Sequence, residues 1–292
     1  MTIRPFRKTA VFILIALAMS VSLAPGQAKP GQAKPAQTPP SKAQPPQASS
    51  APPPSVGDLL KNFSYRNLGP FRAGSWVSAI AVPAAPAREH LYTIYVGMRN
   101  GGVWKTVNNG VTFEPVFDGQ ARLSMGDIAV APSDANVVWV GTGDAFCTRM
   151  STSGDGIYKS TDAGKTWTNM GLRDSHHIAR IMIHPSNPDI VYVAVLGHLF
   201  SANAERGVFK TTDGGKTWTK SLDIVYQGRN VGCVDLAMDP ASPDTLYAAA
   251  YDRLRKPWTY QVGGQGSGVY KTTDAGQTWA KLGGGLPSGV LG

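Results

Sequence analysis

The sequence predicts an all-β fold, a β-propeller built from four-stranded blades, and three observations lead to this prediction. One unit of roughly 50 to 60 residues recurs four times, which is the signature of a stacked or radial architecture. Glycine and proline, with 33 and 22 of the 292 residues, outnumber the 16% that are charged, which favours many turns and short elements. No helical hydrophobic period of useful length occurs outside the first 28 residues.

The repeat opens with glycine, any residue, an aromatic residue and lysine. Its four copies start at Gly102, Gly156, Gly207 and Gly268. Each copy runs directly into a turn motif, at residues 106–113, 160–167, 211–218 and 272–279. The last three motifs are nearly identical and place Thr-Asp before a glycine and Thr-Trp after it, whereas the first is degenerate. Upstream of each copy lie an apolar strand, a turn that contains proline, and a second apolar strand.

The turn motif has a structural interpretation. We expect its Asp to accept backbone N–H bonds, its Gly to adopt a conformation closed to other residues, and its aromatic ring to cover the hairpin. A catalytic or metal-binding role is disfavoured, because carboxylates at the same place in every repeat cannot converge on one site. The residues assigned this structural role are Asn108, Asp162, Gly164, Trp167, Asp213, Gly215, Trp218, Asp274, Gly276 and Trp279.

Each unit supplies about four strands, as a propeller blade requires. The innermost strands are predicted near Ile80, Ile128, Ile181 and Leu236, and the second strands near Tyr95, Trp139, Tyr192 and Tyr247. A third strand enters the turn motif and a fourth leaves it. Four blades fill residues 58–292, and because most propellers need more blades at this size, we expect a truncated larger propeller that is unstable or self-associating by itself.

The first 28 residues have the order of a signal peptide. Arg4, Arg7 and Lys8 precede an apolar run over 10–19 and then small residues, and we expect cleavage after Ala28. The apolar run is short for a bilayer-spanning helix, so we expect no membrane span after cleavage. The predicted location is secreted or periplasmic.

Residues 29–57 are predicted to be a proline-rich disordered linker. The segment contains no aromatic residue and repeats Gly-Gln-Ala-Lys-Pro at 26–30 and 31–35, so it cannot bury enough surface to fold. Six basic residues precede Asp58, the first acidic residue, and account for most of the net charge of +9. The remaining chain is close to neutral, which argues against a nucleic-acid partner.

The turn motifs at 160–167, 211–218 and 272–279 resemble the Asp-box, or BNR, repeat of sialidases, xyloglucanase-type glycosidases, sortilin-type receptor domains and photosystem-assembly propellers. Segments 65–72, 154–159, 205–210 and 234–240 further resemble secreted bacterial proteins named glycosyl hydrolase or sortilin N-terminal (VPS10)-like. The resemblance covers residues from about 63 to 292 and implies an exported propeller that hydrolyses or binds glycans. The alternative that it implies is a sortilin-like module for proteins or peptides, or an assembly scaffold, with no catalysis.

Strand direction alternates within a blade, so the Asp-box turns share one face and the loops between second and third strands share the other. We expect the second face to bind ligand, since propeller scaffolds build sites from such loops. The catalytic candidates there are Asp144, Asp174 and Glu205. Candidates for holding an anionic group are Arg72, Arg149, Arg173 and Arg253, and Trp258 and Tyr260 are candidates for stacking on a sugar ring. Glycoside hydrolysis needs two carboxylates on either side of one bond, which sequence spacing does not establish.

Three further features bear on mechanism. Xyloglucanase-type enzymes carry an early Asp where this sequence has Arg99 ahead of Gly101-Gly102, which weighs against their mechanism. The spacing of His176, His177, His184 and His198 matches no recognised ligand set, so we expect neither a metal nor a cofactor. Cys147 and Cys233 are able to pair outside the cytoplasm or to remain free thiols, and their positions leave both readings open.

Overall fold

The computed structural model describes residues 76–146, 148 and 151–285. Chain contacts separate a unit Met1–Phe63 from a unit Ser64–Gly292, and every described residue belongs to the second. The expected signal peptide and linker, together with Arg72, Arg149 and Cys147, lie outside the described residues. Within the described part of the chain, no helix is long and apolar enough to cross a bilayer.

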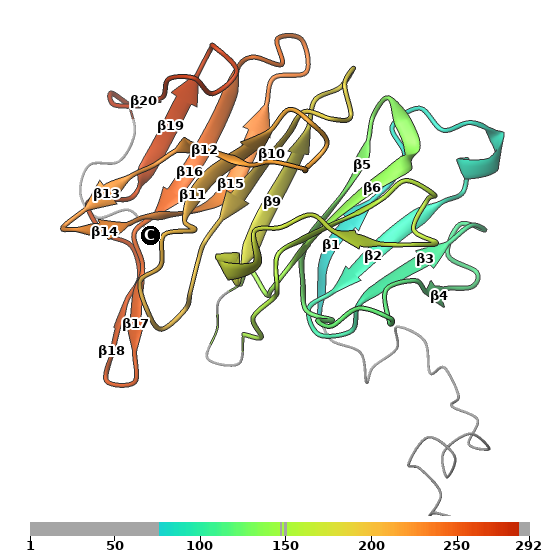
Figure 1. The fold of residues 1–292 in the computed structure, drawn as a ribbon, viewed down its shortest axis with the longest axis horizontal. Helices are drawn as coiled ribbons and strands as arrows, with labels where there is room; N and C mark the ends of the chain where they lie inside the picture. The colour runs from blue at the N-terminus through green and yellow to red at the C-terminus, as the bar shows by residue number, and fades with distance from the viewer. Residues whose placement is uncertain (1–75, 147, 149–150, 286–292) are drawn as a thin grey trace, which may run out of the picture. The chain divides into compact units, whose positions relative to one another are not determined.

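Four antiparallel sheets of four strands follow one another along the chain, which confirms the predicted β-propeller (Figure 1). The first blade consists of β1 (Val77–Ala81), β2 (Ile94–Met98), β3 (Val103–Thr106) and β4 (Glu114–Pro115). The second consists of β5 (Met125–Ala131), β6 (Asp134–Thr142), β7 (Ile157–Ser160) and β8 (Thr168–Asn169).

The third blade consists of β9 (Ile178–Ile183), β10 (Val191–Val195), β11 (Gly207–Thr211) and β12 (Thr219–Leu222). The fourth consists of β15 (Gly232–Met238), β16 (Leu246–Tyr251), β19 (Gly268–Thr272) and β20 (Ala280–Lys281). Two small hairpins are added, β13 (Val225–Tyr226) with β14 (Arg229–Asn230), and β17 (Leu254–Lys256) with β18 (Thr259–Gln261). Two 3₁₀ turns, η1 (Arg88–His90) and η2 (Arg173–Ser175), are the helical elements of the described residues.

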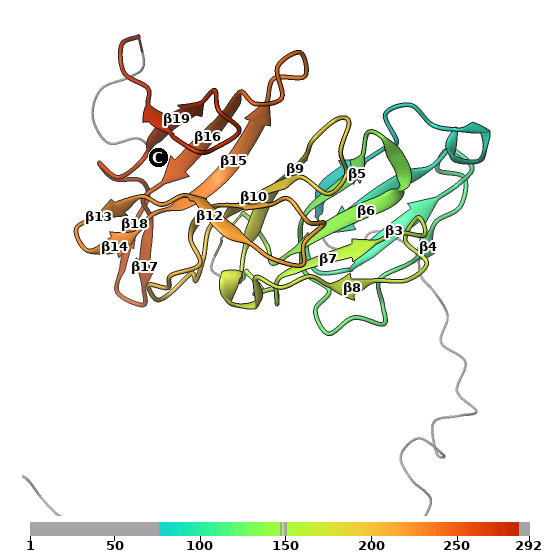
Figure 2. The ribbon, with the colours of Figure 1, turned by 45° about the horizontal axis from the view of Figure 1, so that its top comes forward.

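The innermost strands β1, β5, β9 and β15 contact one another in chain order, so the blades are arranged side by side with their first strands together (Figure 2). Apolar side chains fill the space between consecutive blades. Tyr95 and Phe117 pack between the first two, Trp139 and Val193 between the next two, and Leu222 and Leu246 between the last two. Burial of these side chains from both sides is the main stabilisation of the assembly.

The innermost strands also carry a charged row. Arg180 on β9 pairs with Asp127 on β5, at 3.6 Å from Nη1 to Oδ1, and with Asp235 on β15, at 2.7 Å from Nε to Oδ1. Burial raises the pKa of Asp127 to about 6, although the nearby Arg180 favours the ionised carboxylate.

The Asp-box turns are held by the same hydrogen bonds in each repeat. In the third blade the amide of Thr217 donates to Asp213 Oδ1 at 3.0 Å, and the amide of Gly215 donates to Thr211 Oγ1 at 2.9 Å. Gly215 has φ of +93°, and a side chain there would also collide with the Trp139 ring of the preceding blade.

The repeat residues on either side of the turn connect one blade to the next. Trp218 Nε1 donates to the carbonyl of Met170 in the preceding blade at 2.7 Å, and Trp167 does the same to Val116. Lys210 Nζ donates forward to the carbonyl of Ala275 at 2.8 Å while lying 5.2 Å from the Tyr192 ring centre. We call this pair of contacts, one backward from Trp and one forward from Lys, the inter-blade latch.

Candidate functional site

The connections between second and third strands form one face of the propeller, which we call the loop face. In the third and fourth blades these connections are residues 196–206 and 252–267, and the 3₁₀ turn η2 between the second and third blades lies on the same side. The hairpin β17–β18 projects from this face, at the lower left of the coloured ribbon in Figure 1. Unlike the Asp-box turns, the loops here differ from blade to blade.

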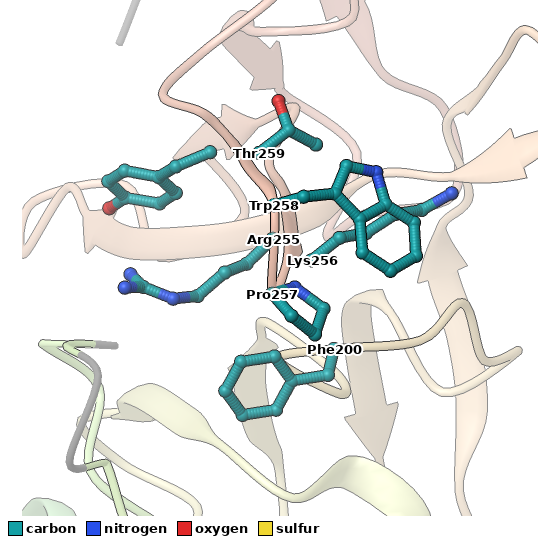
Figure 3. Close-up of a pocket in the computed structure, with 7 residues that line it drawn as sticks. Phe200, Arg255, Lys256, Pro257, Trp258 and Thr259 are labelled. Atoms are coloured by element: carbon teal, nitrogen blue, oxygen red, sulfur yellow. The ribbon is translucent and has the colours of Figure 1, made fainter.

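A pocket of about 530 Å³ lies against the hairpin β17–β18 (Figure 3). Its lining residues are Phe200, Arg255, Lys256, Pro257, Trp258, Thr259 and Tyr260. Trp258 is 78% exposed and Phe200 54% exposed, and Figure 3 shows both rings on the same pocket with Pro257 between them. Large exposed rings that gather at one concavity are typical of a binding site.

Cationic side chains accompany these rings. The Arg255 guanidinium lies 4.5 Å and that of Arg253 5.4 Å from the Tyr260 ring centre, and Lys256 Nζ lies 5.7 Å from the Trp258 ring centre. Arg253 is buried, and this burial lowers its pKa. The Tyr260 ring is therefore engaged by guanidinium groups, and Trp258 presents the most exposed aromatic face of the pocket.

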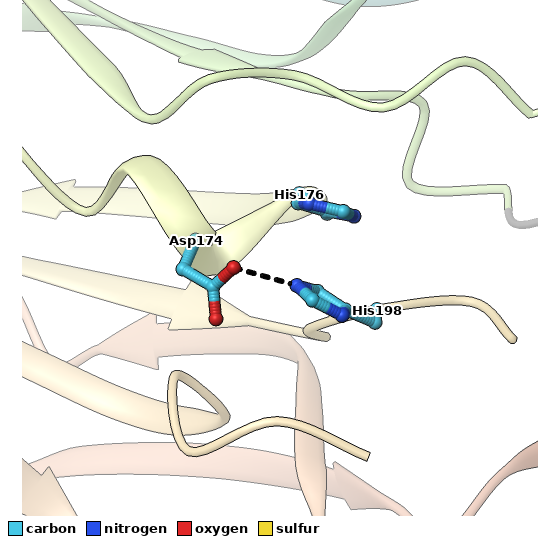
Figure 4. A group of neighbouring side chains, drawn as sticks. All are labelled: Asp174, His176 and His198. Atoms are coloured by element: carbon cyan, nitrogen blue, oxygen red, sulfur yellow. Dashed lines mark hydrogen bonds and ion pairs between the residues drawn. The ribbon is translucent and has the colours of Figure 1, made fainter. Parts of the chain in front are cut away.

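A second pocket of about 260 Å³ shares Phe200 with the first. It is lined by Ser151, Ser153, His176, His177, His198, Leu199, Phe200 and Ser201. His176 and His198 stack with ring centres 3.7 Å apart, and His198 Nε2 lies 2.8 Å from Asp174 Oδ1 (Figure 4). Three imidazoles therefore line this pocket, and the Asp174 carboxylate lies behind one of them, His198.

The charges of this cluster affect one another. Burial, and then the nearby His198, lower the pKa of His176. The hydrogen bond from His198 is the main reason why the pKa of Asp174 is lowered. His177, which is buried, has its pKa lowered by burial to about 4.

The three predicted carboxylates lie in different surroundings. Asp144 is fully buried, with Arg99 Nε at 2.5 Å and Ser151 Oγ at 2.7 Å from its Oδ2. Asn203 Nδ2 donates to the backbone carbonyls of both Asp174 and Glu205, at 2.8 and 3.3 Å, and so brings these two residues together. Burial, followed by the Asp174 charge, raises the pKa of Glu205, whose Oε2 is buried with no hydrogen-bond partner among the described residues.

The remaining predicted residues lie in separate surroundings. Arg173 is exposed and its Nη1 lies 3.8 Å from Asp155 Oδ2. Arg253 packs on Tyr260 and lines the small recess beside Leu196 and Tyr251. Cys233 is a free, buried cysteine, and burial raises the pKa of its thiol to about 12.

Two features of the site were missed by sequence reasoning. Trp258 and Tyr260 were predicted to lie in a loop between a second and a third strand, and the hairpin β17–β18 was not predicted, although Arg-Lys-Pro-Trp-Thr-Tyr at 255–260 has the form of two short strands around a proline turn. The pairing of His176 with His198 was also missed. The order of the strands would have indicated this pairing. His176 precedes β9 and His198 follows β10, and adjacent antiparallel strands place these two positions at the same end of the sheet.

The family model described as Sortilin-Vps10 (sortilin, neurotensin receptor 3) matches residues 101–252 and 155–286, which together cover more than half of the chain.

Curated relatives include a xyloglucanase of Hypocrea jecorina, which is 24% identical over an alignment of 264 residues; the alignment covers 78% of this chain and 29% of that protein. A probable oligoxyloglucan-reducing end-specific xyloglucanase of Neosartorya fischeri is 28% identical over an alignment of 149 residues, which covers 47% of this chain and 16% of that protein. The chain therefore spans less than a third of the length of these relatives.

Among solved structures, an ancestral GH74 enzyme matches 73% of this chain and 25% of its own, with a TM-score of 0.55 and 19% identity. The GH74 enzyme of Niastella koreensis matches 70% of this chain and 30% of its own, with a TM-score of 0.50 and 22% identity. These likenesses establish the shared fold.

Proposed function

The chain belongs to the Sortilin-Vps10 family and is a glycosyl hydrolase-like β-propeller, and from this premise we propose that its loop face binds a carbohydrate polymer. The binding site is the pocket between the hairpin β17–β18 and Phe200. The observation that carries the proposal is the exposed Trp258 ring beside Phe200 on one concave surface.

The chemistry of this pocket suits a sugar chain. The C–H faces of a pyranose ring pack on an aromatic face, and Trp258 and Phe200 offer two such faces. Hydroxyl groups of the same sugar need polar partners, which Thr259, Arg255 and Lys256 supply at the pocket wall. The relatives named as xyloglucanases supply the polymer to try first, xyloglucan.

We propose that the site binds the carbohydrate and does not hydrolyse it. Arg99, which stands where xyloglucanase-type enzymes carry an Asp, is itself paired with the buried Asp144. Asp174 is held by His198 and Asn203, so neither carboxylate is presented alone to a glycosidic bond. A peptide ligand is the alternative that the family suggests, and it enters the experiment as a competitor.

The test is affinity electrophoresis of the full chain through gels containing xyloglucan, with Trp258→Ala beside wild type. Loss of one stacking face is expected to weaken binding about tenfold, equivalent to about 1.4 kcal/mol. Tyr92→Ala is the matched control, because Tyr92 is also an exposed ring, 57% accessible, but lies on the Asp-box side. Equal retardation of wild type and Trp258→Ala, or displacement by an unrelated peptide and not by a xyloglucan oligosaccharide, would refute the proposal.

We further propose that the protein is exported, with residues 1–28 removed as a signal peptide. Intact-mass measurement of the protein expressed in a bacterium should give a mature chain that begins at Lys29 and is recovered outside the cytoplasm. A full-length chain that stays in the cytoplasmic fraction would contradict export.

A further inference from the structure

Independently of the carbohydrate proposal, we propose that Asp174, His176 and His198 form a binding site for one divalent transition-metal ion of the zinc class. Each residue contributes one donor atom, and these three atoms all lie within 4.8 Å of one another. The residues come from two segments that flank strands β9 and β10, so the fold rather than local sequence brings them together (Figure 4).

The geometry is close to that of a metal site. Donor atoms at the corners of a zinc tetrahedron are about 3.3 Å apart when the bonds are about 2.0 to 2.1 Å long. His198 Nε2 and Asp174 Oδ1 are 2.8 Å apart, and the two imidazole planes lie within 22° of each other. The donor atom of His176 lies within 4.8 Å of the other two, and we expect a rotation of its side chain to bring it onto the ion.

The proton arrangement also allows a metal to enter. Nε2 of His198 faces the Asp174 carboxylate, and its Nδ1 lies 2.9 Å from Ser201 Oγ. A metal bound at Nε2 leaves the single ring proton on Nδ1, where Ser201 Oγ accepts it. Outer hydrogen bonds of this kind fix the orientation of ligating histidines in metalloproteins.

The backbones that carry the three donors are held in place. Asn203 accepts from the amide of His198 at 2.9 Å and donates to the carbonyl of Asp174 at 2.8 Å, so one side chain fixes both residues. The carbonyl of His176 accepts from the amide of Gly154 at 2.7 Å. His176 itself has φ of +52°, a costly conformation for a residue with a side chain, and such strain is concentrated at functional sites.

The donor set selects the class of ion. Two imidazoles and one carboxylate suit Zn²⁺, Co²⁺, Ni²⁺ and Cu²⁺, whereas Mg²⁺ and Ca²⁺ take oxygen ligands. The cluster borders the pocket that runs to Phe200, so the remaining coordination positions are accessible to water or to a bound ligand.

The experiment is titration calorimetry of the full chain, free of any polyhistidine tag and dialysed against chelator, with ZnCl₂. The d–d absorption of Co²⁺ gives a second readout that reports the ligand geometry. Variants are His176→Ala, His198→Ala and Asp174→Asn, and His184→Ala is the control because His184 lies in a proline turn on the opposite face. Mg²⁺ serves as the ion expected not to bind.

Wild type and His184→Ala are expected to bind one Zn²⁺ per chain, and each of the three site variants should bind at least tenfold more weakly. Asp174→Asn keeps the shape of the carboxylate, so its weaker binding is not explained by loss of fold, and thermal melting checks the two alanine variants. The proposal is overturned if wild type shows no saturable binding of one ion, or if the double variant His176→Ala, His198→Ala binds Zn²⁺ as wild type does.

Discussion

The two faces of this propeller are built from different kinds of contact. On the Asp-box face the same hydrogen bonds recur in each repeat, so Thr166 donates to Asp162 as Thr217 donates to Asp213. On the loop face each contact occurs once, as between Arg99 and Asp144 or between Arg229 and Asp252. Contacts that recur in every repeat are expected on the Asp-box face if it holds the blades together. Contacts that differ from loop to loop are expected on the loop face if it carries a binding site.

The inter-blade latch gives a structural reason for the tryptophan at the end of the turn motif and for the lysine that precedes the motif. Trp218 spans from its own turn to the preceding blade, and Lys210 from its own strand to the following turn. On the loop face, Arg206 instead donates to the carbonyls of His198 and Ser201 within one loop.

The largest expected effect compares one tryptophan from each face. Trp218→Ala should lower the free energy of unfolding by about 3 kcal/mol, because it removes packing between blades and leaves the Met170 carbonyl without its donor. Trp258→Ala should change it by less than about 0.5 kcal/mol, because that ring is exposed. Urea denaturation followed by circular dichroism measures both, and equal losses would remove the distinction between the faces.

The next effect concerns Asp127 in the charged row between the faces. Its pKa in the folded protein is raised to about 6, so the stability associated with the protonated carboxyl is present at low pH and is lost as pH rises through about 6. We expect Asp127→Asn to gain about 2 to 3 kcal/mol relative to wild type between pH 4 and pH 7.

Between pH 4 and pH 7, the unfolding free energy of wild type has to be compared with that of Asp127→Asn. His177 has its pKa lowered to about 4, so its contribution has the opposite sign and is lost as pH falls. The difference between wild type and Asp127→Asn removes the His177 contribution, since both proteins retain it. A difference in unfolding free energy that stays constant from pH 4 to pH 7 would contradict the raised pKa of Asp127.

A smaller effect on stability than that of Asp127→Asn is expected within one Asp-box turn. Burial alone would raise the pKa of Asp162, but hydrogen bonds from Thr166 and Ser160 outweigh it and lower the pKa to about 2. The carboxylate therefore stabilises the fold above its unfolded pKa, and this contribution is lost as pH falls through about 2. Asp162→Ala should cost about 1 kcal/mol at pH 7, because the group is solvent-screened, and a melting curve identical to wild type would show that the turn does not need its acid.

The difference between the faces also explains what the sequence could predict. The Asp-box side repeats, so periodicity located the strands, and the innermost strands lie where Ile80, Ile128, Ile181 and Leu236 placed them. The loop face offers no second copy for comparison. That Arg99 neutralises Asp144, or that His176 stacks on His198, depends on pairings between residues of different blades or loops, which spacing along the chain does not encode.

The central claim is that the loop face binds the ligand while the Asp-box face holds the blades together. Backbone hydrogen exchange with and without a xyloglucan oligosaccharide tests this claim most directly. The account predicts slower exchange of amides in residues 252–262 and 196–206, with unchanged exchange in the Asp-box turns 160–167 and 211–218. Protection confined to the Asp-box turns, or no protection in the hairpin β17–β18 at saturating oligosaccharide, would contradict it.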